Sequence, residues 1–278
     1  MTGQHNALPT LQDIRSAHSS RKRDYEKYLP ISRFCFRPLG FLLTWLAIRL
    51  QLATETVSFL SGVVGITGCL FLTSDKENLL PLGLALLILF NLLDCVDGSI
   101  ARTMKTENPY GRFLDAFCGA IIDIAFWPII GIMAYRHDYL LTYPKVFGHS
   151  SYFWLAVGAV NCYLTFLILY VETTFDKLLR HDWDQLRLRK INKTPPHSQN
   201  PQKDNLIPSS NETNIRQFLT ILNNNFRARE THYFLLILGF IIHIIDIFLI
   251  IFFIYYIINI LLLLITYINR GRMIRQLY

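Results

Sequence analysis

Three aspartates stand close to one short polar turn between two apolar stretches of the chain. Asp94 and Asp97 lie three residues apart before the turn, and Asp115 lies shortly after it. Acidic side chains within apolar transmembrane segments are costly, so they usually face a polar cavity and serve a function. Carboxylate oxygens are also the ligands that Mg²⁺ prefers, commonly together with substrate phosphates. We therefore predict a divalent-metal site formed by these three carboxylates.

Small residues and one arginine share the helix face that carries the first two aspartates. Positions 94, 97, 98, 101 and 102 are spaced by three or four residues, which places them on one face of a helix. Gly98 and Ala101 leave room for a ligand there, and Arg102 can neutralise a phosphate or brace an aspartate. Each aspartate alone is also compatible with a helix-end or salt-bridge role. The combined pattern favours a site for a phosphorylated ligand.

The apolar stretches that position these residues have the length of membrane-spanning helices. Hydrophobic residues make up 52% of the chain, and its mean hydropathy is +0.30. A helix that rises about 1.5 Å per residue needs roughly 20 apolar residues to cross a hydrocarbon core ~30 Å thick. Four stretches are about this long: 53–73, 79–101, 113–135 and 151–171.

The last apolar run, from His232 to Ile268, is too long for a single crossing. A polar break at His243 and Asp246 predicts two short helices joined by a hairpin, and we interpret both residues as part of that hairpin. Leu39 to Leu52 is too short to span and suits a helix lying in the membrane interface. The predicted fold is an all-α integral membrane protein with six transmembrane helices and an N-terminal interfacial amphipathic helix.

Composition divides the chain into four segments. The third is a polar loop whose ends, 174–190 and 212–228, suit helices, while its centre is rich in Pro and Asn and is expected to be partly disordered. The segments are a polar cytoplasmic arm (1–37), the interfacial helix with transmembrane helices 1–4 and the aspartate motif (38–172), a cytoplasmic loop (173–231), and transmembrane helices 5–6 with a basic tail (232–278).

The basic residues predict the orientation in the membrane, because cytoplasmic flanks retain Lys and Arg. With both termini in the cytoplasm, only Lys76, Arg136 and Lys145 fall outside, and 24 of the 27 basic residues lie inside. The net charge of +7 would then meet anionic lipid headgroups or an anionic nucleotide. Nucleic acid is disfavoured, since no recognition motif accompanies these residues. We expect a multi-pass protein of a bacterial cell membrane or the endoplasmic reticulum.

The motif around the polar turn resembles a known signature. Residues 94–102, then eight residues, Gly111, three residues and Asp115 follow the pattern D-x2-D-G-x2-A-R-x8-G-x3-D-x3-D up to its last position. This pattern is typical of the CDP-alcohol phosphotransferases, also called CDP-alcohol phosphatidyltransferases. The resemblance covers roughly residues 38–172 well and the remainder loosely.

The resemblance implies an enzyme that transfers a substituted phosphate from a CDP-alcohol to an acceptor hydroxyl, with release of CMP. Two Mg²⁺ or Mn²⁺ ions would be bound by Asp94, Asp97 and Asp115. The CDP pocket would be lined by four further positions of the motif, which are Gly98, Ala101, Arg102 and Gly111. One substrate would be a lipid, as in phospholipid or related lipid synthesis.

The sequence departs from this pattern at the fourth aspartate, which the family uses as general base and which is Gly119 here. Loss of a general base typically costs about 10²–10⁴-fold in rate. Asp123 lies one helical turn further, about 6 Å along the axis, and could act through water with Asp115 as the second catalytic carboxylate. It could equally pair with another polar group in the bundle. The alternative function is a divergent member of low activity that binds a nucleotide or a partner.

Two further alternatives concern assembly and transport. Ser61, Gly65 and Cys69 follow one another at four-residue spacing, which lets helices approach closely within the chain or in a homodimer. We favour packing within the chain. An ion transporter would place carboxylates near the bilayer midplane, whereas these lie near the cytoplasmic helix ends.

Overall fold

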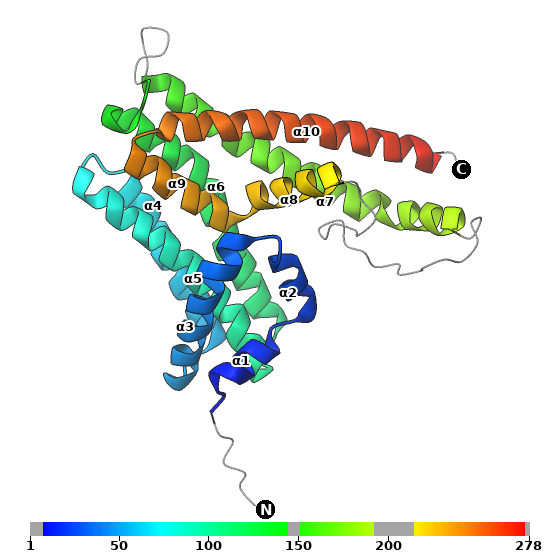
Figure 1. Cartoon of the computed structure of the whole chain (residues 1–278), viewed down its shortest axis with the longest axis horizontal. Coiled ribbons are helices and arrows are strands. Elements are labelled where there is room, and N and C mark those ends of the chain that lie inside the picture. Colours follow the sequence, from blue (N-terminus) through cyan, green and yellow to red (C-terminus); the bar gives the residue numbers. More distant parts are fainter. Residues whose placement is uncertain (1–7, 144–150, 192–213, 276–278) are drawn as a thin grey trace, which may run out of the picture. The chain divides into compact units, whose positions relative to one another are not determined.

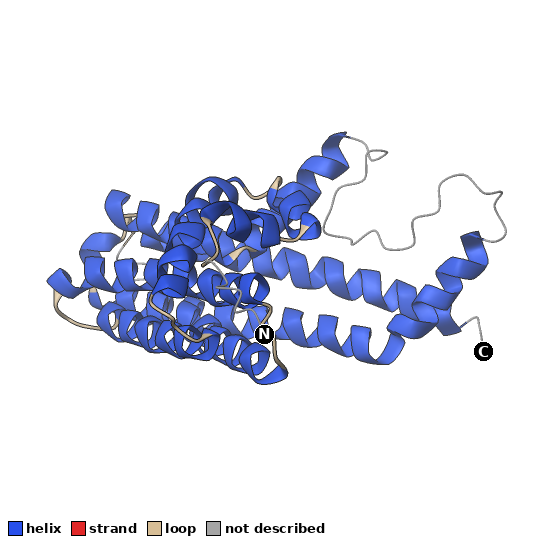
Figure 2. Ribbon diagram, turned by 90° about the horizontal axis from the view of Figure 1, so that it is seen from below, coloured by secondary structure: helices blue, strands red, loops and turns tan. Residues whose placement is uncertain are grey.

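A computed structural model describes residues 8–143, 151–191 and 214–275. All regular secondary structure in these described ranges is helical, which confirms the predicted all-α class (Figure 2). The chain forms two compact units, each built from two separate stretches of sequence. One comprises Met1–Ile129 with Asp204–His243, and the other Ile130–Lys203 with Ile244–Tyr278.

The first unit begins with four short helical segments that lead to the first long helix. The contacts between them are polar as well as apolar. His18 Nε2 lies 2.9 Å from Glu26 Oε2, and Arg37 Nη2 lies 2.7 Å from Glu26 Oε1. Burial raises the pKa of Glu26, but the His18 hydrogen bond and the Arg37 charge outweigh it and leave that pKa below its usual value. The segments are α1 (Leu11–Ala17), α2 (Ser20–Glu26), the π-helical turn η1 (Ser32–Phe36) and α3 (Arg37–Arg49).

Three long helices form the core of the first unit, and glycines set their spacing. α4 and α5 run side by side (Figure 1), and a Cβ added at Gly68 would lie 3.0 Å from the Gly83 carbonyl oxygen. A Cβ at Gly65 would lie 2.8 Å from Ile122 of α6. The small residues of α4 therefore pack within the chain, as predicted. The helices are α4 (Thr54–Leu72), α5 (Leu80–Met104, after the short turn Glu77–Leu79) and α6 (Pro109–Arg136), the last of which continues into the second unit.

The second unit is held together by two long helices that lie side by side, α7 (Ser151–Ile191) and α10 (Ile245–Arg275). Asn161 Nδ2 donates to the Leu249 carbonyl oxygen at 3.1 Å, which is a hydrogen bond between the two helices. Asp246 is fully buried and accepts from the Tyr143 N–H at 2.7 Å. Asp246 therefore ties α10 to Tyr143, and its place in a hairpin stays an interpretation. A short 3₁₀ turn, η3 (Asp138–Leu140), follows α6.

The helix ends differ from the prediction in the second half of the chain. The span expected at 151–171 continues as α7 through the predicted helix 174–190, and α8 (Asn214–Arg227) matches the one predicted at 212–228. Residues 192–213, where disorder is predicted, lie outside the described ranges. The run from 232 does divide at His243, which ends α9 (Arg229–Ile242) in a left-handed conformation with φ 61°.

The number of membrane crossings is the main difference. Within the described residues, five helices are long and apolar enough to span: α4, α5 with its preceding turn, α6, α7 and α10. α9 has 14 residues and is therefore about 21 Å long, less than a hydrocarbon core. The second helix of this run was predicted to be short, but α10 has 31 residues because it continues through the basic tail. A sixth crossing and the interfacial position of α3 stay predictions.

Candidate functional site

The turn between α5 and α6 is fixed by one asparagine. Lys105 ends α5 in a left-handed conformation with φ 54°. Asn108 Oδ1 then accepts from the Gly111 N–H at 2.7 Å, which satisfies a free amide in the first turn of α6. Its Nδ2 donates to Glu55 Oε1 of α4, also at 2.7 Å. The turn is thereby tied to α4, and the aspartates on either side of it are held near one another.

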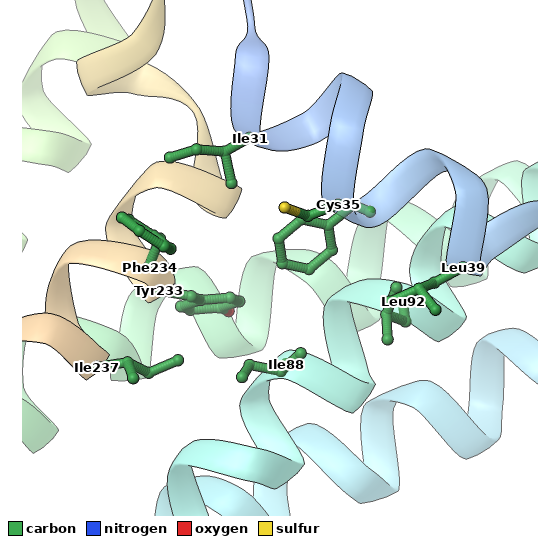
Figure 3. A pocket seen from close by; sticks show the side chains of 9 residues that line it. Ile31, Cys35, Leu39, Ile88, Leu92, Tyr233, Phe234 and Ile237 are labelled. Carbon is green, nitrogen blue, oxygen red and sulfur yellow. The ribbon is translucent and has the colours of Figure 1, made fainter.

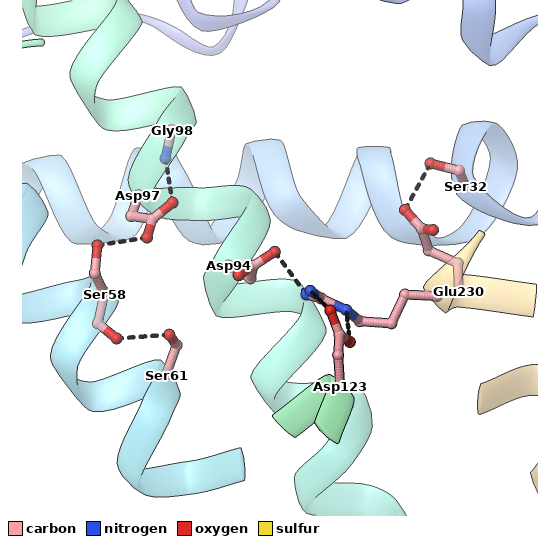
Figure 4. A network of polar contacts seen from close by, with 9 residues as sticks. Ser32, Ser58, Ser61, Asp94, Asp97, Gly98, Asp123 and Glu230 are labelled. Atoms are coloured by element: carbon pink, nitrogen blue, oxygen red, sulfur yellow. Dashed lines mark hydrogen bonds and ion pairs between the residues drawn. The ribbon is translucent and has the colours of Figure 1, made fainter. Parts of the chain in front are cut away.

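Asp97 is the most enclosed of the three motif aspartates, with a relative exposure of 2%. The Ser58 hydroxyl of α4 donates to Asp97 Oδ2 at 2.5 Å, and the Gly98 N–H donates to Oδ1 (Figure 4). Both oxygens are therefore oriented by the protein. Ser58 is not among the residues predicted for the site, although a serine inside an apolar span is a signal that could have found it.

Asp94 and Asp115 come from facing helices. Asp94 is partly buried on α5, and Asp115 is exposed on α6, yet their side chains are close enough to interact. Asp115 also interacts electrostatically with Asp97. Asp115 therefore lies within electrostatic reach of both aspartates of α5.

Arg229, the first residue of α9, also reaches this site and was not predicted. Its Nη1 donates to Asp94 Oδ2 at 3.0 Å. Its Nε and Nη2 donate to Asp123 Oδ1 and Oδ2, both at 2.9 Å. The guanidinium also lies 5.2 Å from the centre of the Phe90 ring, a cation–π distance. Asp123 is therefore paired with a polar group of the bundle, and its catalytic role stays a prediction.

The small-residue face of α5 is partly covered by its own arginine. Arg102 Nη2 donates to Ser99 Oγ at 3.3 Å, and a Cβ at Gly98 would lie 3.1 Å from Arg102 Nη1. Ala101 is buried on the same helix. The space expected beside Gly98 is therefore occupied by the guanidinium, which a ligand would have to displace or contact.

Two further cations from the N-terminal segments lie near Arg102. Burial lowers the pKa of Lys22, and the positive charges of Arg102 and Arg37 lower it further. Such an effect requires the three cations to be close. Glu26, the ion-pair partner of Arg37, offsets part of this positive charge.

The donor chemistry of the site suits a hard divalent cation, since all three predicted ligands are carboxylates. The arrangement is less complete than the sequence implies. Among the described residues, no three Asp, Glu, His or Cys side chains converge on a single point as metal ligands do. Asp94 already shares one oxygen with a guanidinium. The residues that would hold an ion are present, but a cation of the protein contacts one of them.

The fold and the site together define a membrane-spanning helical protein with an acidic polar site near one end of two helices. Residues 51–174 match a family model described as CDP-alcohol phosphatidyltransferase. The matched segment includes the three motif aspartates and Gly119, whereas Arg229 lies outside it. Comparison with curated proteins and with solved structures gave no match.

Replacing Ser58 with alanine tests the support of Asp97. We expect a loss of roughly 10-fold to 100-fold in Mg²⁺ affinity, the usual cost of removing a group that orients a metal ligand. Ser61→Ala is the matched control, because its hydroxyl donates only to the Ser58 carbonyl oxygen. Titration of Mg²⁺ by calorimetry measures both. Equal affinities in the two variants would contradict a role for Ser58 in orienting Asp97.

Proposed function

We propose that the protein transfers a substituted phosphate from a CDP-alcohol to an acceptor hydroxyl and releases CMP. The family domain supports phosphatidyl transfer from a CDP-alcohol in general. The observation that supports the proposal is that Asp115 of α6, at the spacing of the signature, interacts with both Asp94 and Asp97 of α5. Phospholipid or related lipid synthesis is the corresponding role.

Asp94, Asp97 and Asp115 are the residues that would hold Mg²⁺ or Mn²⁺. A bound divalent cation supplies Lewis-acid polarisation of a phosphoryl oxygen and stabilises the departing phosphate. The contribution of this chain is to fix the ligands. Asp97 is oriented by Ser58 and the Gly98 amide, and Asp115 is presented from the neighbouring helix.

Positively charged and small residues would bind the CDP part of the donor. Arg102 can turn from Ser99 towards a phosphate, because its hydrogen bond to that hydroxyl is long at 3.3 Å. Lys22 and Arg37 add positive charge beside it. Gly98, Ala101 and Gly111 would line the pocket, where small side chains permit close approach of a ligand.

Asp115 and Asp123 are the carboxylates proposed to move the proton of the acceptor hydroxyl. Asp115 is exposed, so an acceptor can approach it. Both oxygens of Asp123 accept hydrogen bonds from Arg229, so its use as a base requires that pair to loosen or a water molecule to intervene. We therefore propose that Asp115 takes the proton directly and that Asp123 acts through a water molecule, because the Arg229 guanidinium can donate hydrogen bonds but cannot accept a proton.

An apolar cavity supports a lipid as one substrate. It has a volume of about 180 Å³. Its wall is formed by η1, α3, α5 and α9 (Figure 3). Tyr233 contributes to its wall and stands four residues after Arg229 on the same helix, so the cavity and the acidic site share α9. An apolar wall of this kind suits a hydrocarbon chain. The other side chains of the wall are Ile31, Cys35, Phe36, Leu39, Ile88, Leu92, Phe234 and Ile237.

A second candidate is a divergent protein that binds a nucleotide or a partner with little turnover. It is favoured by one observation, the absence of a carboxylate at Gly119 together with the guanidinium beside it. Binding of a CDP-alcohol without CMP release would support this second candidate.

The proposal is tested by incubating the purified full-length protein in lipid vesicles with Mg²⁺ and a panel of CDP-alcohols that includes CDP-diacylglycerol. Each donor is offered with candidate acceptor alcohols, and CMP and the lipid product are measured together. We expect CMP release that depends on one donor–acceptor pair. If every donor binds and none yields CMP, the protein is instead a binding protein with little turnover, which is the second candidate function.

A further inference from the structure

Arg229 places a positive charge inside the acidic site. Its three hydrogen bonds to carboxylates join two aspartates of different helices, Asp94 on α5 and Asp123 on α6. A guanidinium stays protonated in proteins, and a bidentate pair with a carboxylate fixes its orientation. Phe90 packs against its face as well. Arg229 is therefore a fixed cation and one of the best-held side chains of the site.

The space that this cation fills exists because residue 119 is glycine. A Cβ added at Gly119 would lie 3.1 Å from Arg229 Nη2 and 4.0 Å from Asp94 Oδ1. The first distance is shorter than an ordinary contact, and the atoms of a longer side chain would extend beyond that Cβ. A side chain at 119 and the guanidinium therefore compete for one place beside Asp94.

The guanidinium limits what Asp94 can offer to a metal ion. Oδ2 of Asp94 is hydrogen-bonded to Nη1 at 3.0 Å, so an ion on that oxygen would meet a like charge at close range. Both oxygens of Asp123 are engaged by the same arginine. The remaining oxygen of Asp94, with Asp97 and Asp115, leaves donors for a single ion.

We infer that Arg229 is a resident cation of this site and takes the place of one divalent ion, so that the chain binds one Mg²⁺ or Mn²⁺ rather than two. The inference rests on the proposed metal site, and it adds a residue from outside the family domain. Gly119 and Arg229 then act as a matched pair. The glycine clears the space, and the arginine supplies the positive charge there.

The test is a count of Mn²⁺ ions bound per chain, measured by equilibrium dialysis of the full-length protein in detergent with Mn²⁺ as the only added ligand. We expect one ion in the wild type and two in Arg229→Gln, because that change frees Asp94 and Asp123. Gly119→Asp alone should still bind one, since its new carboxylate pairs with Arg229. The double variant should bind two.

Arg227→Gln is the matched control, because Arg227 is exposed, two residues earlier, and its loss removes the same charge. It should bind one ion, as should Arg229→Lys. A wild-type count of two or of none overturns the inference without any variant, so it stays testable even if Arg229→Gln fails to fold. An unchanged count in a folded Arg229→Gln overturns it as well. A wild type that binds one ion but releases no CMP would contradict the proposed function and leave this inference standing.

Discussion

Replacing Asp97 with asparagine is expected to abolish Mg²⁺-dependent binding of a CDP-alcohol. The change keeps the size of the side chain but removes the negative charge that a hard divalent cation requires. Asp97 is buried and hydrogen-bonded through both oxygens, so no neighbouring carboxylate can take its position. Calorimetry with and without a chelator measures the metal-dependent part of the affinity.

The control for this change is Asp24→Asn. Asp24 is an exposed aspartate of the N-terminal segments whose partner is the exposed Lys27, so its loss should leave the affinity unchanged. Asp94→Asn should behave like Asp97→Asn. Unchanged affinity in both motif variants would remove the basis for a metal site at these residues.

Asp123→Asn has the second largest expected effect. If Asp123 is the general base, turnover should fall by about 10²-fold or more while the affinity for the nucleotide stays nearly constant, because the loss acts on the chemical step. Steady-state kinetics over a range of donor concentrations separate kcat from KM. The same measurement on Arg229→Gln shows whether turnover depends on the orientation that Arg229 gives to Asp123.

The contrary outcomes are also informative. A wild type that turns over normally, with Asp123→Asn equally active, would reject both Asp123 as the base and the low-activity alternative. A change in affinity with constant kcat would instead indicate that Asp123 serves to hold Arg229. The proton acceptor would then have to be Asp115 or a group of the substrate.

The three motif aspartates could be placed from the sequence because their arrangement is local. Asp94 and Asp97 share a helix face by spacing, and the short turn returns the chain so that Asp115 faces them. Helix periodicity and a tight connection are enough for this prediction. The helices themselves followed from apolar length, and their starts agree with the prediction to within a few residues in α4, α5 and α6.

Arg229 could not be placed in the same way. It lies 135 residues after Asp94, and its position depends on how α9 packs against α5. In the sequence it is a basic residue before an apolar run, which by itself indicates only a membrane flank. No spacing rule links it to Gly119, so the closeness of these two residues emerges only from the packed structure.

The lengths of the later helices could not be predicted from the sequence either. Hydropathy ends α7 where its apolar run ends, near 171, but the helix continues to Ile191. Phe175 stacks on Tyr267 of α10 at 4.1 Å, and Arg270 lies over Trp183 at 5.1 Å. These contacts extend both helices past their apolar parts. Hydropathy averaged along the chain cannot detect such contacts between distant residues.

The most direct test of the central claim is the amount of CMP formed from a CDP-alcohol by the wild type and by Asp94→Asn in the same vesicles. We predict Mg²⁺-dependent CMP formation that requires an acceptor alcohol in the wild type, and none above the protein-free background in the variant. Equal CMP formation by both proteins would contradict the assignment of the aspartate site. If the wild type formed no CMP with any donor and acceptor, the proposed transferase activity would be contradicted.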